Sequence, residues 1–262
     1  MSQWIVSNVP SWLLLAALVV GITAGTLILL KFVRRRYPRL QEGEHNDIAK
    51  VGFSVVGPVY GFMTGFIVVV LWGQVNSADQ VVRTEATSAV QLVRDANAFT
   101  KADGDRIRQT LLEYERSAVA EWPAAARGRS TPEAENALAR LYTTYADIQP
   151  TDDKQRSSLT SSLASLKQLS TSRTERLIMA RTNTGPTWSL WGVVFLVSGL
   201  VLGFAVIIGE AQGRMHFVMV TAVSVLVAVI LFLITELSHP FLGEIGTSPE
   251  PMRAVIDAVE SQ

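Results

Sequence analysis

The sequence predicts an all-α membrane protein with four transmembrane helices in two hairpins, plus an inserted helical-bundle domain outside the membrane. Three observations predict this fold. Apolar residues make up 48% of the 262 residues, and they concentrate in four uncharged runs. Each run is about 20 residues long, which is the length that a helix needs to cross about 30 Å of hydrocarbon. The segment between the second and third runs has amphipathic patterns instead.

The four runs should all be helices, because lipid offers backbone groups no hydrogen-bond partners. They are Ser11–Leu30, Val51–Gly73, Thr187–Gly209 and Phe217–Thr235. Tryptophans stand near the ends of the runs, where the headgroup layer favours amphipathic rings. No Asp, Glu, Lys or Arg lies in the middle of a run, which disfavours a proton-coupled transporter.

Basic residues predict the orientation. The loop between the first two runs contains Lys31, Arg34, Arg35, Arg36, Arg39 and Lys50. Because short cytoplasmic loops are rich in Lys and Arg, we expect a multi-pass protein of a bacterial plasma (inner) membrane with its N-terminus outside. The expected parts are residues 1–75 (first hairpin with its cytoplasmic loop), 76–186 (extracytoplasmic helical domain), 187–237 (second hairpin) and 238–262 (extracytoplasmic tail).

The inserted domain reads as four antiparallel helices. The first expected helix is Asp79–Phe99, which could continue the second run as one long helix. The second follows Asp103–Gly104 and ends near Trp122–Pro123. The third begins at Pro132 after a Ser130 or Thr131 cap, and the fourth begins after a Thr151 or Asp152 cap. Their expected buried residues include Leu138, Leu141, Tyr142, Tyr145, Ile148, Leu159, Leu163, Leu166 and Leu177. A charge network is expected among Glu85, Glu121, Arg127, Arg173 and Arg176.

Composition excludes several classes of function. The formal net charge is zero, which disfavours a nucleic-acid partner. The chain has no cysteine, so it has no disulfide, thiolate nucleophile or Cys-ligated metal. No nucleophile elbow, phosphate loop or metal motif is present. We therefore expect neither an enzyme nor a cofactor.

The second run contains the strongest candidate for a functional surface. Gly57, Gly61 and Gly65 recur every four residues, and small residues at this spacing let helix backbones approach closely. The stripe would pack within one chain or between subunits around a pore. Phe62 and Phe66 lie about 100° round the helix from it. They would form an apolar constriction that gates by dewetting, or face lipid.

Ionisable residues gather at both ends of the runs. They are Glu44, His45, Asp47 and Glu210 at the cytoplasmic rim, and Glu236 and His239 at the outer rim. Rings of acidic side chains select cations in oligomeric pores. The alternative is that these residues are ordinary interfacial groups. Neither the His45–Asp47 pair nor the Glu236–His239 pair has a zinc spacing, so no metal is expected.

Several short motifs resemble those of an uncharacterised, mainly bacterial family of bestrophin-like membrane proteins. The most specific are Glu121-Trp122-Pro123 and Pro240-Phe241 followed by Gly243. The others are His45-Asn46, Gly57, Tyr60, Gly65-Phe66, Trp72, Glu85-Ala86, Tyr114, Arg127-Gly128, Leu169-Ser170, Arg173, Arg176-Leu177, Pro186 and Trp188. One departure is Ser238-His239, where family members usually carry Asp-Arg.

The resemblance implies a homo-oligomeric ion channel, since true bestrophins are pentameric anion channels. It also implies a cytoplasmic helical domain, which is opposite to the orientation that the charges predict. A fold-level likeness is weak evidence of activity. We expect an ion channel or passive ion-permeation pathway lined by the second run, with inorganic ions and the lipid bilayer as partners. The alternative is a non-transporting sensor or assembly module that binds a partner through its helical domain.

Overall fold

The four apolar runs are helices, as the sequence predicts. The computed structural model describes residues 6, 9–37, 44–182, 185–208 and 213–261, with residues 44–46 and 213 described by their backbone. The described residues contain helices and turns but no strand. The chain divides into two compact units, Met1–Gly73 with Thr184–Ile245 and Gln74–Asn183 with Gly246–Gln262.

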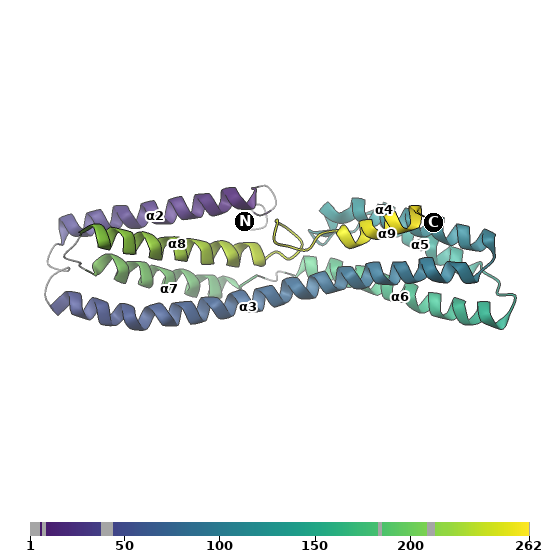
Figure 1. Ribbon diagram of the computed structural model, residues 1–262, viewed down its shortest axis with the longest axis horizontal. Coiled ribbons are helices and arrows are strands. Elements are labelled where there is room, and N and C mark those ends of the chain that lie inside the picture. Colours follow the sequence, from purple (N-terminus) through teal and green to yellow (C-terminus); the bar gives the residue numbers. More distant parts are fainter. Residues whose placement is uncertain (1–5, 7–8, 38–43, 183–184, 209–212, 262) are drawn as a thin grey trace. The chain divides into compact units, whose positions relative to one another are not determined.

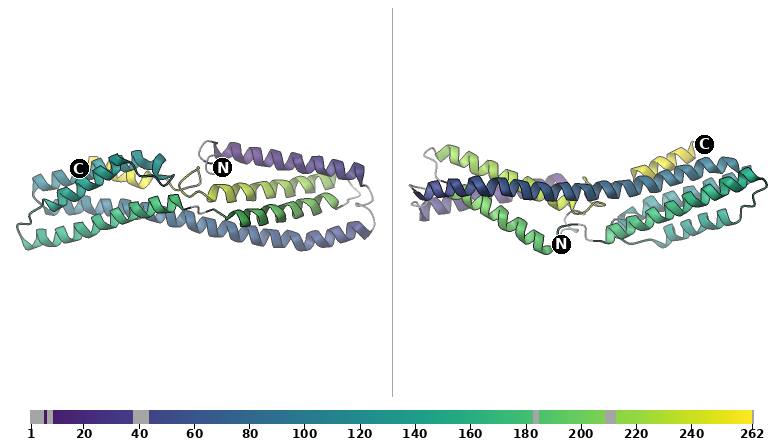
Figure 2. Two further views of the ribbon diagram at one scale, coloured as in Figure 1. Left: turned by 180° about the vertical axis from the view of Figure 1, so that it is seen from behind. Right: turned by 90° about the horizontal axis from the view of Figure 1, so that it is seen from below.

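Unit 1 contains the four apolar helices. They are α2 (Ser11–Arg36), the N-terminal part of α3 (Glu44–Asp95), α7 (Trp188–Ile207) and α8 (Gly213–Leu237). Helix α2 packs chiefly on α8, and α7 contacts both of them (Figures 1 and 2). Each is long and apolar enough to cross a membrane. The all-helical fold and the four candidate spans therefore agree with the prediction.

One end of unit 1 has a small apolar core that joins three helices. Leu30 of α2, Ala205 and Val206 of α7, and Val220 of α8 are buried together there. Gly52 lies close to α7 at this end of the unit, because an added Cβ would lie 2.6 Å from the Phe204 ring and would force that ring to shift. Of the glycines of α3, Gly52 is the one that lies closest to α7.

Unit 2 is a helical bundle. It contains the C-terminal part of α3, the 3₁₀ turn η2 (Ala96–Ala98), α4 (Lys101–Ala125), α5 (Pro132–Ala146), α6 (Asp153–Arg181) and α9 (Glu250–Glu260). Helix α4 packs on α5, α6 and α9. Helix α3 runs unbroken from Glu44 to Asp95, which confirms that the second run continues into the domain.

Two helix starts in unit 2 are as predicted from capping signals. Helix α5 begins at Pro132 with Thr131 as the N-cap residue. Helix α6 begins after Asp152, whose Oδ1 accepts a hydrogen bond of 2.7 Å from the Gln155 N–H. Such a bond satisfies one of the free N–H groups at a helix start.

The predicted start of the second domain helix is wrong. Helix α4 begins at Lys101, and Asp103 and Gly104 lie in its first turn. Thr100 is the N-cap, and its Oγ1 accepts from the Asp103 N–H at 3.2 Å. Gly104 is needed for close packing, since an added Cβ would lie 2.8 Å from the Ala96 carbonyl oxygen.

The predicted buried faces are only partly correct. Leu141, Tyr145 and Leu166 are buried, but Tyr142 is 39% and Leu163 is 43% exposed. On α5 the small residues Ala134 and Ala137 are buried with Leu141 and Tyr145, and on α6 Ser162 and Leu169 are buried with Leu166. These faces therefore combine small and large residues, and the pattern of large apolar residues alone does not define them.

The C-terminal tail contains a helix that the sequence analysis does not identify. Helix α9 buries Met252, Val255 and Val259, which recur at three- and four-residue steps. It packs on α4, and Arg116 of α4 forms an ion pair of 2.7 Å with Glu260. Residues 246–262 thus belong to the helical domain.

Candidate functional site

The membrane part of α3 has one face covered by its own chain. Tyr60 and Thr64 are each 2% exposed. The Thr64 hydroxyl donates a hydrogen bond of 2.7 Å to the Tyr60 carbonyl oxygen. The Ser198 hydroxyl of α7 donates to the Tyr60 hydroxyl at 3.4 Å. These polar groups satisfy one another, as buried polar groups in lipid must.

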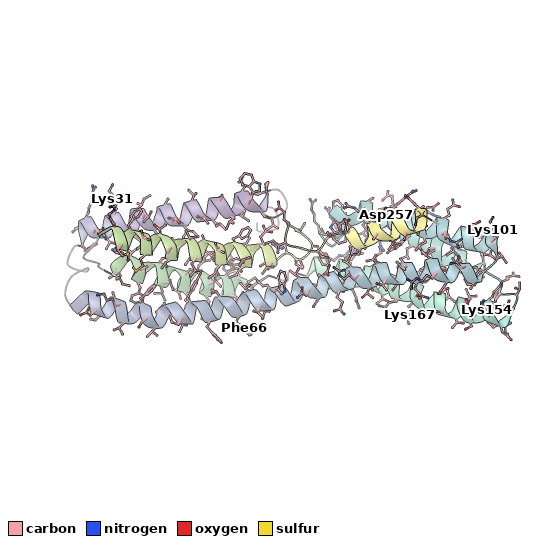
Figure 3. The ribbon with its side chains drawn as sticks, in the orientation of Figure 1. Lys31, Phe66, Lys101, Lys154, Lys167 and Asp257 are labelled. Carbon is pink, nitrogen blue, oxygen red and sulfur yellow. The ribbon has the colours of Figure 1, made fainter. Side chains whose placement is uncertain are left out.

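The opposite face of α3 is uncovered. Phe62 is 79%, Phe66 64% and Val69 68% exposed in the chain. At 100° per residue, Phe62 lies about 200° round the helix from Tyr60. Figure 3 shows the Phe66 side chain pointing away from the other helices of unit 1. This face is therefore open to lipid or to another copy of the chain.

The glycine stripe is also open. No heavy atom lies within 4 Å of a Cβ added at Gly57, Gly61 or Gly65. Gly52, one helical turn and a half before the stripe, does meet α7. None of the described helices therefore packs on the stripe, and a second helix has room to approach it.

The predicted rim residues are spread over different environments. The side chains of Glu44 and His45, and the whole of Glu210, lie outside the described residues. Asp47 is exposed and lies 3.8 Å from Lys50. Glu236 and His239 are 1% and 8% exposed. Acidic rings select ions where they face water, and in this chain Glu236 does not.

The described residues at these rims do not form a metal centre. Within the described ranges, no group of three or more His, Asp or Glu side chains is arranged so that it could hold a metal ion. The Glu236 carboxylate instead packs against Gly243, which has a φ of +77°. Glycine is needed there because an added Cβ would collide with that carboxylate.

A hydrogen-bond chain that the sequence analysis does not identify joins three helices at the basic end of unit 1. Arg34 of α2 donates to His216 Nδ1 at 2.6 Å. Because a guanidinium only donates, Nδ1 must accept and the ring proton is on Nε2. Nε2 then donates to the Ala205 carbonyl oxygen of α7 at 3.0 Å.

Unit 2 contains the predicted charge network, in its buried core. Arg176 of α6 donates to both carboxylate oxygens of Glu85 of α3, from Nε at 2.9 Å and from Nη2 at 3.2 Å. Arg173 donates to Glu121 of α4 at 2.7 Å and 3.3 Å. Arg127 is exposed and does not belong to this network.

The network also contains Tyr114 and Glu115 of α4. The Tyr114 hydroxyl donates to Glu85 at 2.7 Å. Glu115 is fully buried, and neither carboxylate oxygen has a hydrogen-bond partner among the described residues. Burial, and then the nearby Glu85 carboxylate, raise the pKa of Glu115 well above its usual value, against the opposing effect of Arg176. This shift favours the protonated, neutral form of Glu115.

The charges of the cluster balance when Glu115 carries its proton. Glu85 and Glu121 then oppose Arg173 and Arg176. Arg176 also lies 3.8 Å from Glu121 and stacks over the Trp122 ring at 5.4 Å. A signal for Glu115 exists in the sequence, because it lies four residues after Leu111 and three before Ala118, on the buried face of the helix.

The family assignment agrees with these features. The bestrophin-like domain family matches residues 20–252. The chain belongs to the bestrophin-like family. Its buried cluster is formed by motif residues that carry the resemblance, including Glu85, Tyr114, Glu121 and Arg176.

Two solved structures have the same fold as this bestrophin-like chain. Both are crystal structures of a bacterial bestrophin homologue from Klebsiella pneumoniae, each with a single substitution. One has a TM-score of 0.64 at 16% identity, covering 94% of this chain and 98% of that one. The other has a TM-score of 0.59 at 15% identity, covering 93% and 95%. No curated protein matches this chain.

Proposed function

We propose that this bestrophin-like chain assembles with copies of itself into an ion channel whose pore is lined by α3. The uncovered face of α3 carries the proposal, because Phe62 and Phe66 are 79% and 64% exposed and no other described helix packs on the glycine stripe. In a closed ring of copies, each α3 presents the same face to the axis. The glycines would meet a neighbouring α3 while Phe62 and Phe66 face the pore.

The proposed topology follows from the basic residues. The four apolar helices would cross the membrane as two hairpins, with the loop after α2 in the cytoplasm and the N-terminus outside. The helical domain, inserted between the hairpins, would lie outside the bacterial plasma membrane. Five copies are proposed by analogy with true bestrophins. Inorganic ions would be the permeating species, with no enzymatic step.

The experiment that tests the channel is single-channel recording of the purified chain in a planar bilayer under a salt gradient. The test variant is Gly61→Leu, which adds a bulky side chain to the open stripe. The matched control is Gly21→Leu on α2, because no heavy atom lies within 4 Å of a Cβ added at Gly21 either. Both variants add the same side chain to an open position of an apolar helix.

We expect discrete currents that Gly61→Leu abolishes or reduces and that Gly21→Leu leaves unchanged. The reversal potential under the gradient then shows which ions permeate. A cation-selective channel is expected if the acidic rims determine selectivity, and an anion-selective channel if the analogy with true bestrophins holds. Silence from folded oligomer across voltage, pH and calcium would overturn the proposal. Equal effects of the two variants on the currents would contradict a pore lined by α3.

Silence would favour the alternative, a module that binds a partner through its helical domain. The surface of unit 2 has a cleft of about 380 Å³ between α3 and α6 that suits such a role. It is lined mostly by polar residues, including Gln80, Thr84, Gln168 and Glu175. Substitution of Gln168 and Glu175 by Ala would then release the partner, which co-purification in native membranes measures.

A further inference from the structure

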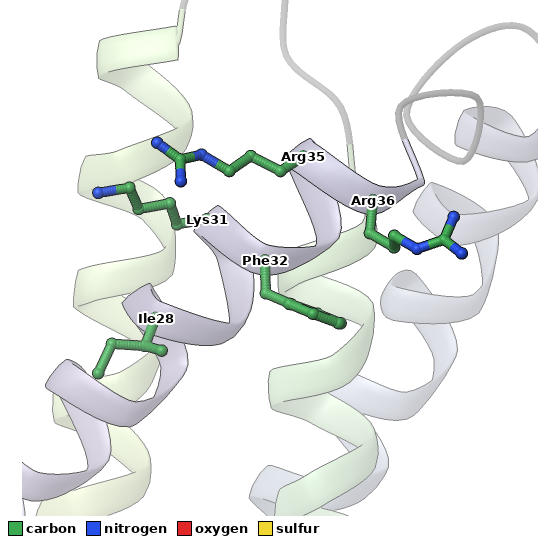
Figure 4. A pocket seen from close by; sticks show the side chains of 5 residues that line it. All are labelled: Ile28, Lys31, Phe32, Arg35 and Arg36. Atoms are coloured by element: carbon green, nitrogen blue, oxygen red, sulfur yellow. The ribbon is translucent and has the colours of Figure 1, made fainter.

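The basic end of α2 contains a cleft that the proposed channel does not use. The last turns of α2 carry Lys31, Arg34, Arg35 and Arg36. A cleft of about 620 Å³ lies here, lined by Lys31, Arg34 and Arg35 above Leu27, Ile28, Leu30 and Phe217 of α8. An adjoining cleft of about 510 Å³ is lined by Ile28, Lys31, Phe32, Arg35 and Arg36 (Figure 4).

Two of the cations converge and have no partner among the described residues. Lys31 and Arg35 are four residues apart, on the same side of a helix, and Figure 4 shows both side chains pointing the same way. Neither forms an ion pair or hydrogen bond with any described residue. Arg34 differs, because it donates to His216. Within the described part of the chain, the Lys31–Arg35 pair therefore presents two cationic donors without an acceptor, which an oxyanion would satisfy.

The apolar part of the cleft lies on the membrane side of these cations. Ile28 is 70% and Phe217 50% exposed in the chain, although both belong to helices apolar enough to cross a membrane. Along the surface of α2, the side chains thus change from apolar at Ile28 to cationic at Arg35 within two helical turns. A phospholipid has the same order of groups, an acyl chain below a phosphate.

We infer that this cleft binds one anionic phospholipid, with its phosphate between Lys31 and Arg35 and its acyl chain against Ile28 and Phe217. The lipid would bridge α2 and α8. The chain of hydrogen bonds from Arg34 through His216 to Ala205 links α2, α8 and α7 beside the cleft. Basic clefts between transmembrane helices bind anionic headgroups in this way. The inference requires only that α2 crosses the membrane.

Native mass spectrometry of the purified full chain in neutral detergent tests this site. The chain is titrated with phosphatidylglycerol or with phosphatidylcholine, and the dissociation constant of the first bound lipid is measured. The test variant is Lys31→Gln/Arg35→Gln. The matched control is Lys50→Gln/Arg214→Gln, which removes one charge from the second turn of α3 and one from the first turn of α8, and neither residue lines the cleft.

We expect one phosphatidylglycerol per chain, bound in preference to phosphatidylcholine. The test variant should bind it about 30-fold more weakly, because each Lys or Arg near an anionic headgroup strengthens attachment about fivefold. The control should stay within about threefold of the parent. Phe217→Ala should also weaken phosphatidylglycerol binding, and glycerol phosphate, which lacks acyl chains, should not displace the lipid.

Three outcomes would overturn the site. One is equal affinity for the two lipids, and another is parental affinity in the test variant. The third is an equal loss in the control, which would mean diffuse attraction to the whole basic surface. If the double variant unfolds in detergent without lipid, the single Arg35→Gln variant, with an expected fivefold loss, decides between these results.

Discussion

Removal of the Arg176 guanidinium should destabilise unit 2 more than any surface substitution does. Arg176 is fully buried, and Arg176→Met keeps much of its apolar length while it removes the charge. The change breaks both hydrogen bonds to Glu85, and hydrogen bonds to charged groups contribute about 1.5–3 kcal/mol each. It also leaves a buried carboxylate without its counter-ion, for which the measured cost is about 3–5 kcal/mol.

Hydrogen exchange of the full chain in detergent, read by mass spectrometry, measures this cost locally. At about 1.4 kcal/mol per tenfold, the protected amides of α4 and α6 should exchange roughly two to three and a half orders of magnitude faster. The matched control is Arg94→Met on the exposed side of α3. Its effect should stay within about 0.5 kcal/mol.

A double-mutant cycle separates the ion pair from loss of packing. Glu85→Gln/Arg176→Met should cost less than the sum of the two single variants by about 1–3 kcal/mol, because removal of both charges leaves neither one uncompensated. Additive costs, or parental exchange in Arg176→Met, would refute the assignment of the Glu85–Arg176 pair as the centre of the domain core.

Three further predictions concern acidity, gating and orientation. The folded domain binds the Glu115 proton more tightly than the unfolded chain does. The contribution of Glu115 to the stability of the domain should therefore be complete below about pH 4.3, its unfolded pKa, and be lost as pH rises through the raised pKa. The difference in hydrogen exchange between the parent and Glu115→Gln isolates this contribution and should vary with pH in that sense; a difference that does not vary with pH would contradict a buried neutral acid. Phe66→Ala should increase single-channel conductance or open probability by widening an apolar constriction, whereas unchanged currents would place Phe66 against lipid. Since the chain has no cysteine, single-cysteine variants report the orientation of the chain in the membrane. A membrane-impermeant maleimide added to intact cells should label Lys101→Cys on α4 (Figure 3) but should not label Lys50→Cys. The reverse labelling pattern would place the helical domain in the cytoplasm.

The helices were largely predictable from the sequence, for local reasons. A run of about 20 apolar residues must be a helix in lipid whatever surrounds it. The start of α5 at Pro132 and the cap of α6 at Asp152 depend on neighbouring residues alone. The continuity of α3 follows from the lack of a breaker between Gly73 and Asp95. Each of these features is decided within one or two helical turns of chain.

The charge cluster was predictable only in part. Glu85, Glu121, Arg173 and Arg176 were expected to form a network, and the structure joins them. Arg127 was expected there and is exposed. The burial of Glu115 was missed, because a carboxylate with no partner is not expected in a core, even at a position where the helix period allows it.

By itself, the sequence determined that four helices are apolar enough to span a membrane and that an amphipathic helical segment separates two of them from the other two. Only the tertiary structure decided which face of each apolar helix is covered. The physical reason is that a transmembrane helix is apolar all round, so hydrophobicity does not separate residues that face protein from those that face lipid. Packing of α7 against Tyr60 and Gly52 left Phe62, Phe66 and the glycine stripe of α3 open.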